Sequence, residues 1–225
     1  MPEPPLGGRR GACTVAATAC AATGVALIAF GLPTAGSPPP PPPRPAPAVT
    51  APRAAPSGPP VQPLPRARPQ RVRAPAIGLD VRTEPVGLDD DGSVALPDNA
   101  DHAGWFTRTP APGQSGNAVV VGHVDSDSGP AAFYGLGSLR PGDRIVVDRE
   151  RGPAAEFTVS AATVYDRGDF PSSTVYGPTT EPRLTLVTCA DWDPDRRTYR
   201  ANLVVTARLA PPAEPRVRER PRTTR

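Results

Sequence analysis

Proline, more than any other feature, limits which part of this chain can fold. Of the 225 residues 35 are proline, and sixteen of them fall between Pro33 and Pro69. Proline lacks the backbone N–H that helices and sheets need, so residues 33–70 are expected to form a disordered, polyproline-like linker. Residues 211–225, rich in proline and arginine, are expected to form a disordered basic tail. The folded domain is therefore predicted to span residues 71–210.

An uncharged stretch precedes the linker. Residues 12–32, ACTVAATACAATGVALIAFGL, follow Arg9 and Arg10. A helix of this length, at about 1.5 Å per residue, spans a bilayer core of about 30 Å. We expect an uncleaved transmembrane signal anchor, with residues 1–11 in the cytoplasm and the rest of the chain outside. A cleaved signal peptide is the alternative, since small residues near position 30 could form a cleavage site.

The distribution of charge argues against a nucleic-acid partner. The whole chain carries a formal charge of +3, but residues 71–210 contain fourteen arginines against nineteen aspartates and glutamates. A domain that neutralises phosphates would be positive, whereas this one is negative. The net positive charge lies in the residues before and after this domain.

The predicted domain consists of short apolar runs separated by Gly and Asp turn signals. This pattern is typical of an all-β barrel or sandwich, and about 140 residues can form one sizeable core. One brief segment, residues 131–139, looks helical. The expected strands cover residues 76–86, 94–95, 117–123, 143–149, 156–166, 183–189 and 199–209.

A single cysteine ends one of these strands. In LTLVTCADWD, residues 184–193, an apolar run stops at Cys189 and is followed by polar residues. Because Cys13 and Cys20 lie in the expected membrane span, Cys189 has no disulfide partner in its own domain. A free thiol in an exported domain is either a buried small hydrophobe or a reactive group, and its position alone does not decide between them.

Two other residues favour the reactive group. His123, in NAVVVGHVDS, also follows a strand, so strand ends at one barrel rim would bring it to Cys189 as the base a nucleophilic thiol needs. His102 lies in a polar loop and is expected to be exposed or to make a minor contact in the groove. Arg200 is the candidate donor to an oxyanion, because on its strand it shares a face with Asn202 and Val204. Arg196 and Arg197 belong to a turn and are weaker candidates.

These stretches resemble motifs of the sortase family. LTLVTC is similar to the family's TLxTC strand, GHVDS to its histidine turn, and YRANLVVTA to its arginine strand. Three longer stretches resemble the class F branch of the family: GWFTRTPAPGQSGNAVVVGHVDS, GPAAFYGLGSLRPGDRIVV and LDDDGSVALP. The similarity covers residues 71–209. Many sortases have the arginine directly before the apolar end of its strand, where this chain has Asn202; Arg200 lies two residues earlier.

The resemblance implies a closed eight-stranded β-barrel and a cysteine transpeptidase that works without a metal or cofactor. Cys189 would attack a backbone carbonyl in an LPxTG-like sorting signal near the C-terminus of an exported protein. His123 would protonate the leaving amine and later act as a base, while Arg200 would steady the oxyanion. Thr188 and Asn202 would contact the substrate. An amine of a peptidoglycan precursor would then resolve the thioacyl enzyme at the outer face of the cell membrane.

Other functions remain open at this point. An L,D-transpeptidase is disfavoured because no Ser-His-Gly-Cys-type run adjoins Cys189. Two alternatives remain. One is a thiol hydrolase of the same fold that acts on peptides, and the other is a non-catalytic membrane-tethered β-module with an inert thiol. Asp89–Gly92 superficially resembles a calcium loop but lacks the required spacing, so we expect a hairpin turn there.

Overall fold

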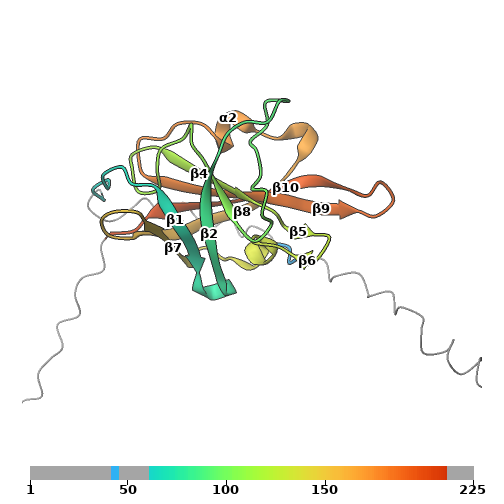
Figure 1. Cartoon of the computed structure of the whole chain (residues 1–225), viewed down its shortest axis with the longest axis horizontal. Helices are drawn as coiled ribbons and strands as arrows, with labels where there is room; N and C mark the ends of the chain where they lie inside the picture. The colour runs from blue at the N-terminus through green and yellow to red at the C-terminus, as the bar shows by residue number, and fades with distance from the viewer. Residues whose placement is uncertain (1–41, 46–60, 212–225) are drawn as a thin grey trace, which may run out of the picture. The chain divides into compact units, whose positions relative to one another are not determined.

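The expected β-barrel is closed in the structure, a computed structural model that describes residues 42–45 and 61–211 (Figure 1). The strand order around the barrel is β1-β2-β3-β4-β9-β10-β8-β7. Neighbouring strands pair antiparallel, except β2 with β3 and β4 with β9, which are parallel. The strands are β1 (Pro69–Ala74), β2 (Leu79–Val86), β3 (Ala103–Phe106), β4 (Asn117–Gly122), β7 (Arg144–Arg149), β8 (Ala155–Asp166), β9 (Arg183–Asp193) and β10 (Thr198–Leu209).

Short elements connect these strands. The 3-10 helices are η1 (Pro75–Ile77), η2 (Tyr134–Ser138) and η3 (Arg167–Asp169); a four-residue helix, α2 (Ser172–Val175), and a small hairpin of β5 (Asp125–Ser126) and β6 (Gly129–Pro130) complete the set. The predicted all-β, closed eight-stranded barrel with short helices is thus confirmed. The expected membrane span at residues 12–32 lies outside the described residues, among which no helix has the length and apolar character to cross a bilayer.

Several predicted boundaries were wrong. The strand of Cys189 does not end there, because β9 continues to Asp193 and forms a long hairpin with β10. β1 and β3 were not predicted, and β1 begins at Pro69, inside the segment expected to be a disordered linker. The helical segment predicted at residues 131–139 shortens to η2. Packing also begins before residue 71: the backbone N–H of Leu64 donates to the carbonyl oxygen of Gly113 at 2.8 Å.

Strand β4 is buried on both of its faces. All six residues of β4 are buried, which is why its sequence is a continuous apolar run and not an alternating one. Val120 belongs to the core inside the barrel, whereas Val119 and Val121 belong to a second apolar cluster on the outer face. The outer cluster consists of Phe106, Val119, Val121, Val175, Val187 and Val204, with Val86, Val94, Tyr165, Phe170 and Tyr176 packed against it.

A buried polar pair ties the outer cluster to the barrel. Asn117 opens β4, and its amide Nδ2 donates to the carbonyl oxygen of Val175 in α2 at 2.7 Å. The hydroxyl of Thr185 in β9 donates to Asn117 Oδ1, also at 2.7 Å. Since buried polar atoms are costly when unpaired, these bonds fix both the pairing of β4 with β9 and the position of α2.

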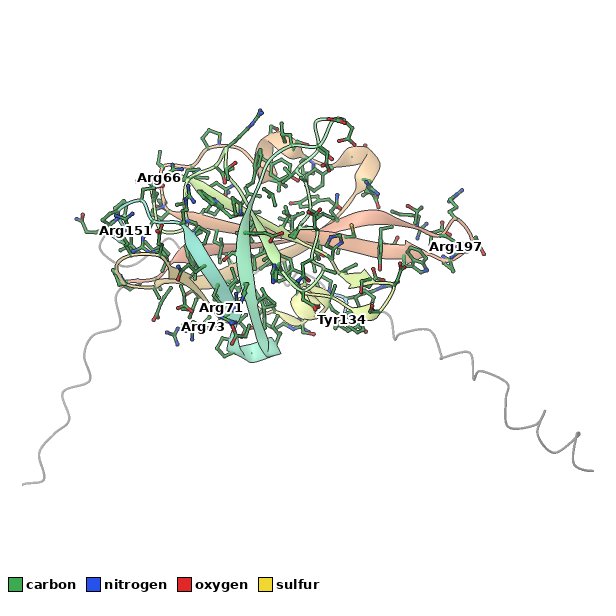
Figure 2. The ribbon with its side chains drawn as sticks, viewed as in Figure 1. Arg66, Arg71, Arg73, Tyr134, Arg151 and Arg197 are labelled. Carbon is green, nitrogen blue, oxygen red and sulfur yellow. The ribbon has the colours of Figure 1, made fainter. Side chains whose placement is uncertain are left out.

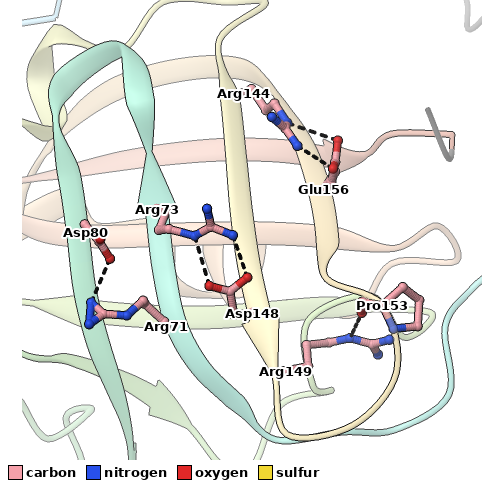
Figure 3. Close-up of polar contacts among 8 residues, drawn as sticks. All are labelled: Arg71, Arg73, Asp80, Arg144, Asp148, Arg149, Pro153 and Glu156. Atoms are coloured by element: carbon pink, nitrogen blue, oxygen red, sulfur yellow. Dashed lines mark hydrogen bonds and ion pairs between the residues drawn. The ribbon is translucent and has the colours of Figure 1, made fainter. Parts of the chain in front are cut away.

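Ion pairs line the outer wall formed by β2, β1, β7 and β8 (Figure 3). Arg71 pairs with Asp80 at 2.8 Å, Arg73 binds Asp148 through two hydrogen bonds of 2.6 and 2.9 Å, and Arg144 pairs with Glu156. Each arginine reaches a diagonal neighbour on the adjacent strand, not the residue directly opposite it. These pairs are largely exposed, so each contributes at most about 1 kcal/mol.

We expect Asn117→Ala to lower the free energy of unfolding by about 2–4 kcal/mol, since it leaves the Val175 carbonyl and the Thr185 hydroxyl without their partner. Thr185→Val removes one of the two bonds and should cost about 1–3 kcal/mol. Urea unfolding of residues 61–211 measures both. A loss below about 0.5 kcal/mol for Asn117→Ala would mean that the pair does not hold the two strands together.

Candidate active site

The parallel pairing of β4 and β9 determines where His123 and Cys189 lie. The register runs from Asn117 opposite Arg183 to Val121 opposite Val187. Extended two residues, past the end of β4 at Gly122, this register would bring His123 level with Cys189. A hydrogen bond of 2.8 Å from the Thr188 hydroxyl to the Gly122 carbonyl shows that the strands are still adjacent at that point. Adjacent strands are about 4.8 Å apart, so the backbone at the end of β4, just before His123, lies beside the part of β9 that carries Cys189.

Cys189 is half-buried and is the only free cysteine within the described residues. Burial is the main cause that raises the pKa of its thiol; the carboxylate of Asp125 raises it further, while the guanidinium of Arg167 lowers it. The thiol is therefore protonated at neutral pH. To act as a nucleophile it has to lose this proton to a base.

His123 has one ring nitrogen engaged by the backbone. Its Nε2 lies 2.9 Å from the carbonyl oxygen of Pro97. Because a carbonyl oxygen can only accept, Nε2 carries the proton, and in the neutral ring Nδ1 is left as the proton acceptor. The other histidine differs from its prediction: His102 is half-buried, and its Nδ1 lies 3.2 Å from a carboxylate oxygen of Glu84.

Arg200 lies on the same face as Cys189 but is paired with aspartates. Its strand neighbour Asn202 sits directly opposite Cys189 in the β9–β10 register, and Arg200 is two residues away along β10. Its Nη2 donates to Asp191 Oδ2 at 2.7 Å, and its Nε lies 3.9 Å from Asp193 Oδ2. Asp191 has a left-handed backbone with φ of 57°. The charge of Arg200 is therefore held by carboxylates that follow the cysteine.

The two predicted substrate-contacting residues have different surroundings. Thr188 is buried, and its hydroxyl already donates to Gly122 in β4, so it stabilises strand pairing. It also lines a cavity beside Cys189. Asn202 is half-buried opposite Cys189.

Three residues near the thiol were not identified as site residues from the sequence. The hydroxyl of Tyr199 in β10 donates to the carboxylate of Asp125, which follows His123 by two residues. Burial and this hydrogen bond raise the pKa of Tyr199, so its hydroxyl remains a donor. The contact ties the loop after the histidine to the strand that carries Arg200. Arg167 donates to the Tyr199 carbonyl oxygen at 3.5 Å, and no sequence signal marks it.

The comparison that decides the family is with models of protein domains. The sortase domain model matches residues 72–210 of the chain. The chain belongs to the sortase family. Sortases are cysteine transpeptidases that act on proteins bearing a sorting signal and on cell-wall amines.

Solved sortase structures share the fold of this sortase. Sortase A from Listeria monocytogenes is 19% identical with a TM-score of 0.50, over 64% of this chain and 88% of the other. Sortase A from Corynebacterium diphtheriae is 20% identical with a TM-score of 0.51, over 67% and 65%. Streptococcus agalactiae sortase C1, in its complex with MTSET, is 23% identical with a TM-score of 0.51, over 64% and 68%. A comparison with curated proteins found no match.

The charges around the thiol of this sortase give a pH prediction. We expect the alkylation rate of Cys189 to rise with pH to a midpoint above that of an ordinary cysteine. Asp125→Asn should move the midpoint to lower pH, because removing a negative charge favours the thiolate. Arg167→Gln should move it to higher pH. Iodoacetamide rates between pH 6 and 11 measure these shifts, with the exposed Asp127→Asn as the control. A midpoint unchanged in Asp125→Asn would contradict the assignment of this carboxylate.

Proposed function

We propose that this chain is a membrane-anchored sortase of the class F type, with Cys189 as nucleophile, His123 as acid and base, and Arg200 as oxyanion donor. The single observation that carries the proposal is the β4–β9 register, which aligns His123 with Cys189 on adjacent strands. The β9–β10 register then puts Arg200 on the same face. The proposal assigns these three residues, far apart in sequence, to one Cys-His-Arg mechanism.

In the first half of the reaction, the thiol of Cys189 gives its proton to Nδ1 of His123 and attacks a backbone carbonyl carbon of the sorting signal. The carbonyl oxygen becomes an oxyanion in the tetrahedral intermediate. The intermediate collapses with cleavage of the C–N bond, and His123 returns the proton to the leaving amine. A thioacyl enzyme remains. The hydrogen bond to Pro97 keeps the histidine ring in the tautomer that these transfers need.

In the second half, an amine of a peptidoglycan precursor attacks the thioester carbon. His123 takes the proton of the attacking amine, the C–S bond breaks, and the leaving thiolate of Cys189 takes this proton back from His123. The exported protein is then joined to the cell-wall precursor through a new amide bond. When water attacks in place of the amine, the same steps give hydrolysis.

Arg200 has to exchange partners during this cycle. In the structure its guanidinium faces Asp191, and its side chain is 53% exposed, so the ion pair is of the kind that contributes little and is readily broken. An oxyanion forming at Cys189 offers a competing negative charge. We propose that Arg200 moves from Asp191 to this oxyanion and that Asp191 holds it between turnovers.

Binding of the sorting signal would use the outer apolar cluster. Val121 and Val187 in this cluster lie two residues before His123 and Cys189 on the same faces of their strands. Val121 and Val187 are buried, and an extended peptide that approaches the thiol along this face would meet the partly exposed Phe170 and Tyr176 that pack against the cluster. The cell-membrane location with an extracytoplasmic barrel, the LPxTG-like signal, and the substrate contacts of Thr188 and Asn202 are part of the same proposal.

The proposal predicts that Cys189→Ala abolishes transpeptidation without unfolding the barrel. Residues 61–211 are incubated with an LPxTG peptide and an amine acceptor, and the joined product is measured by mass spectrometry. The variant should form at least about a thousandfold less product, because no thioacyl enzyme can form. Urea unfolding should show a stability within about 1 kcal/mol of the wild type. Wild-type activity in this variant would exclude the mechanism.

A second pair of variants tests the oxyanion donor. Arg200→Ala should lower kcat/KM by about a hundredfold or more, the typical loss when one oxyanion donor is removed. Arg197→Ala removes an exposed arginine from the tip of the same hairpin (Figure 2) and should leave kcat/KM unchanged. Equal rates in the two variants would assign oxyanion stabilisation to another group. Peptide cleavage without a joined product would indicate the alternative function, a thiol hydrolase of this fold.

A further inference from the structure

The loop that follows His123 is shaped by local contacts. It contains the small hairpin of β5 and β6. The backbone N–H of Phe133 donates to the carbonyl oxygen of His123 at 2.9 Å, and that of Ala131 donates to the carbonyl oxygen of Val124 at 3.1 Å. These bonds give the loop its form, but they do not join it to β9, the strand that carries the thiol.

Tyr199 in β10 supplies that connection. Its hydroxyl donates to the carboxylate of Asp125 in β5, across 74 positions of sequence. Asp125 comes only two residues after His123, so the bond acts on the short stretch of backbone that carries the imidazole. A single side-chain contact therefore joins the histidine loop directly to the hairpin of β9 and β10.

The ring of Tyr199 is itself held in place. It lies opposite Trp192 in the β9–β10 register, with 5.0 Å between the ring centroids. Its backbone carbonyl oxygen accepts from Nη1 of Arg167 at 3.5 Å. Both aromatic residues belong to the part of the hairpin beyond Cys189, which extends past the barrel and reaches β5 (Figure 1). The extension of the hairpin thus brings a fixed hydroxyl to the histidine loop.

This contact lies close to the thiol. Burial is the main cause that raises the pKa of both Cys189 and Tyr199, and the carboxylate of Asp125 raises both further. The hydroxyl of Tyr199 therefore keeps its proton and remains a donor at neutral pH. The other charged or titratable groups around the contact are His123, Arg167 of η3, Tyr134 of η2, Arg200 of β10 and Asp191 of β9.

We propose that Tyr199 is a positioning residue for the catalytic histidine. By binding Asp125, its hydroxyl holds the loop that carries His123 against the β9–β10 hairpin and so keeps the imidazole in line with the thiol. This role rests on the function proposed above, in which His123 exchanges protons with Cys189. Neither Tyr199 nor Asp125 touches the reacting atoms in this role.

A second restraint is needed because the bond to Pro97 does not fix the imidazole by itself. That bond holds Nε2 of His123 2.9 Å from the Pro97 carbonyl oxygen and sets the tautomer, but the ring can still turn about it. The direction of Nδ1 then depends on the backbone of residues 123–125. Proton transfer needs about 2.6–3.2 Å between heavy atoms, so a displacement of about 1 Å slows it by up to about a hundredfold.

Tyr199→Phe removes the hydroxyl and keeps the ring against Trp192. The full-length chain in detergent micelles is given an LPxTG peptide and an amine acceptor, and the joined product is measured by mass spectrometry. We expect kcat to fall by about tenfold or more and KM to change by less than about threefold, because the substrate contacts remain. Each variant is assayed at its own pH optimum and below its unfolding temperature, where a purely structural role leaves kcat unchanged.

Substitutions of Asp125 separate the hydrogen bond from the charge. Asp125→Asn removes the charge but keeps an oxygen that accepts from the Tyr199 hydroxyl, whereas Asp125→Ala removes both. We expect kcat to be at least about fivefold higher in Asp125→Asn than in Asp125→Ala. Asp127→Ala, which removes an exposed carboxylate from the same loop, should leave kcat at the wild-type value. Tyr199→Phe should have no further effect when it is added to Asp125→Ala, since the two residues act through one bond.

NMR reads the position of the histidine without any substrate. The Cε1–H signals of His123 and His102 are followed in the full-length chain in detergent micelles. Tyr199→Phe and Asp125→Ala should shift or broaden the signal of His123. The signal of His102, whose Nδ1 lies beside Glu84, should stay in place and serves as the internal control.

The outcomes distinguish this role from the proposed function. Wild-type kcat and an unchanged His123 signal in Tyr199→Phe overturn the positioning role even when the wild type joins peptide to amine. Losses of kcat that add up in the double variant of Tyr199→Phe and Asp125→Ala also overturn it, because they show two independent effects. A His123 signal that moves in Tyr199→Phe, with no joined product from any chain, supports the positioning of the histidine and rejects the transpeptidase.

Discussion

The parallel pairing of β4 with β9 is the interaction on which the rest of the structure depends. It joins two segments more than sixty residues apart in sequence, and its register aligns the ends of two buried apolar runs. A shift by one residue would turn His123 to the opposite face from Cys189, because side chains alternate along a strand. The buried bonds of Asn117 at one end and Thr188 at the other fix the register on both sides of the apolar run.

The groups around the thiol oppose its ionisation more than they favour it. Asp125 and burial both oppose the thiolate, while Arg167 favours it. Arg200, which would stabilise an oxyanion, is neutralised by Asp191. A nucleophile that is protonated at rest is protected from oxidation and from adventitious electrophiles, since the thiolate is the reactive form. Substrate binding would then supply the change in surroundings that the chemistry needs.

Much of this architecture could be predicted from the sequence, for identifiable reasons. β4, β7, β8 and β10 are long enough for their apolar residues to show a pattern, and their predicted positions agree closely with the structure. β3 was not predicted because its four residues, Ala103–Phe106, are all buried and show no alternation of apolar and polar side chains. The end of β9 was misplaced because Ala190–Asp193 looks like a polar loop, while in fact it extends a hairpin whose faces carry Trp192 and Asp191.

The orientation of charged side chains could not be predicted, because it depends on contacts that no local pattern encodes. Alternation correctly put Arg200 on the face of Cys189, yet the guanidinium turns to Asp191, whose own left-handed backbone is a local exception. The same carboxylate meets Arg44, a residue that belongs to the proline-rich segment by sequence and to the site by position. One aspartate therefore pairs with two arginines, Arg44 and the proposed oxyanion donor Arg200. A change of charge at Arg44 would therefore alter the electrostatic field at Arg200 through their shared carboxylate.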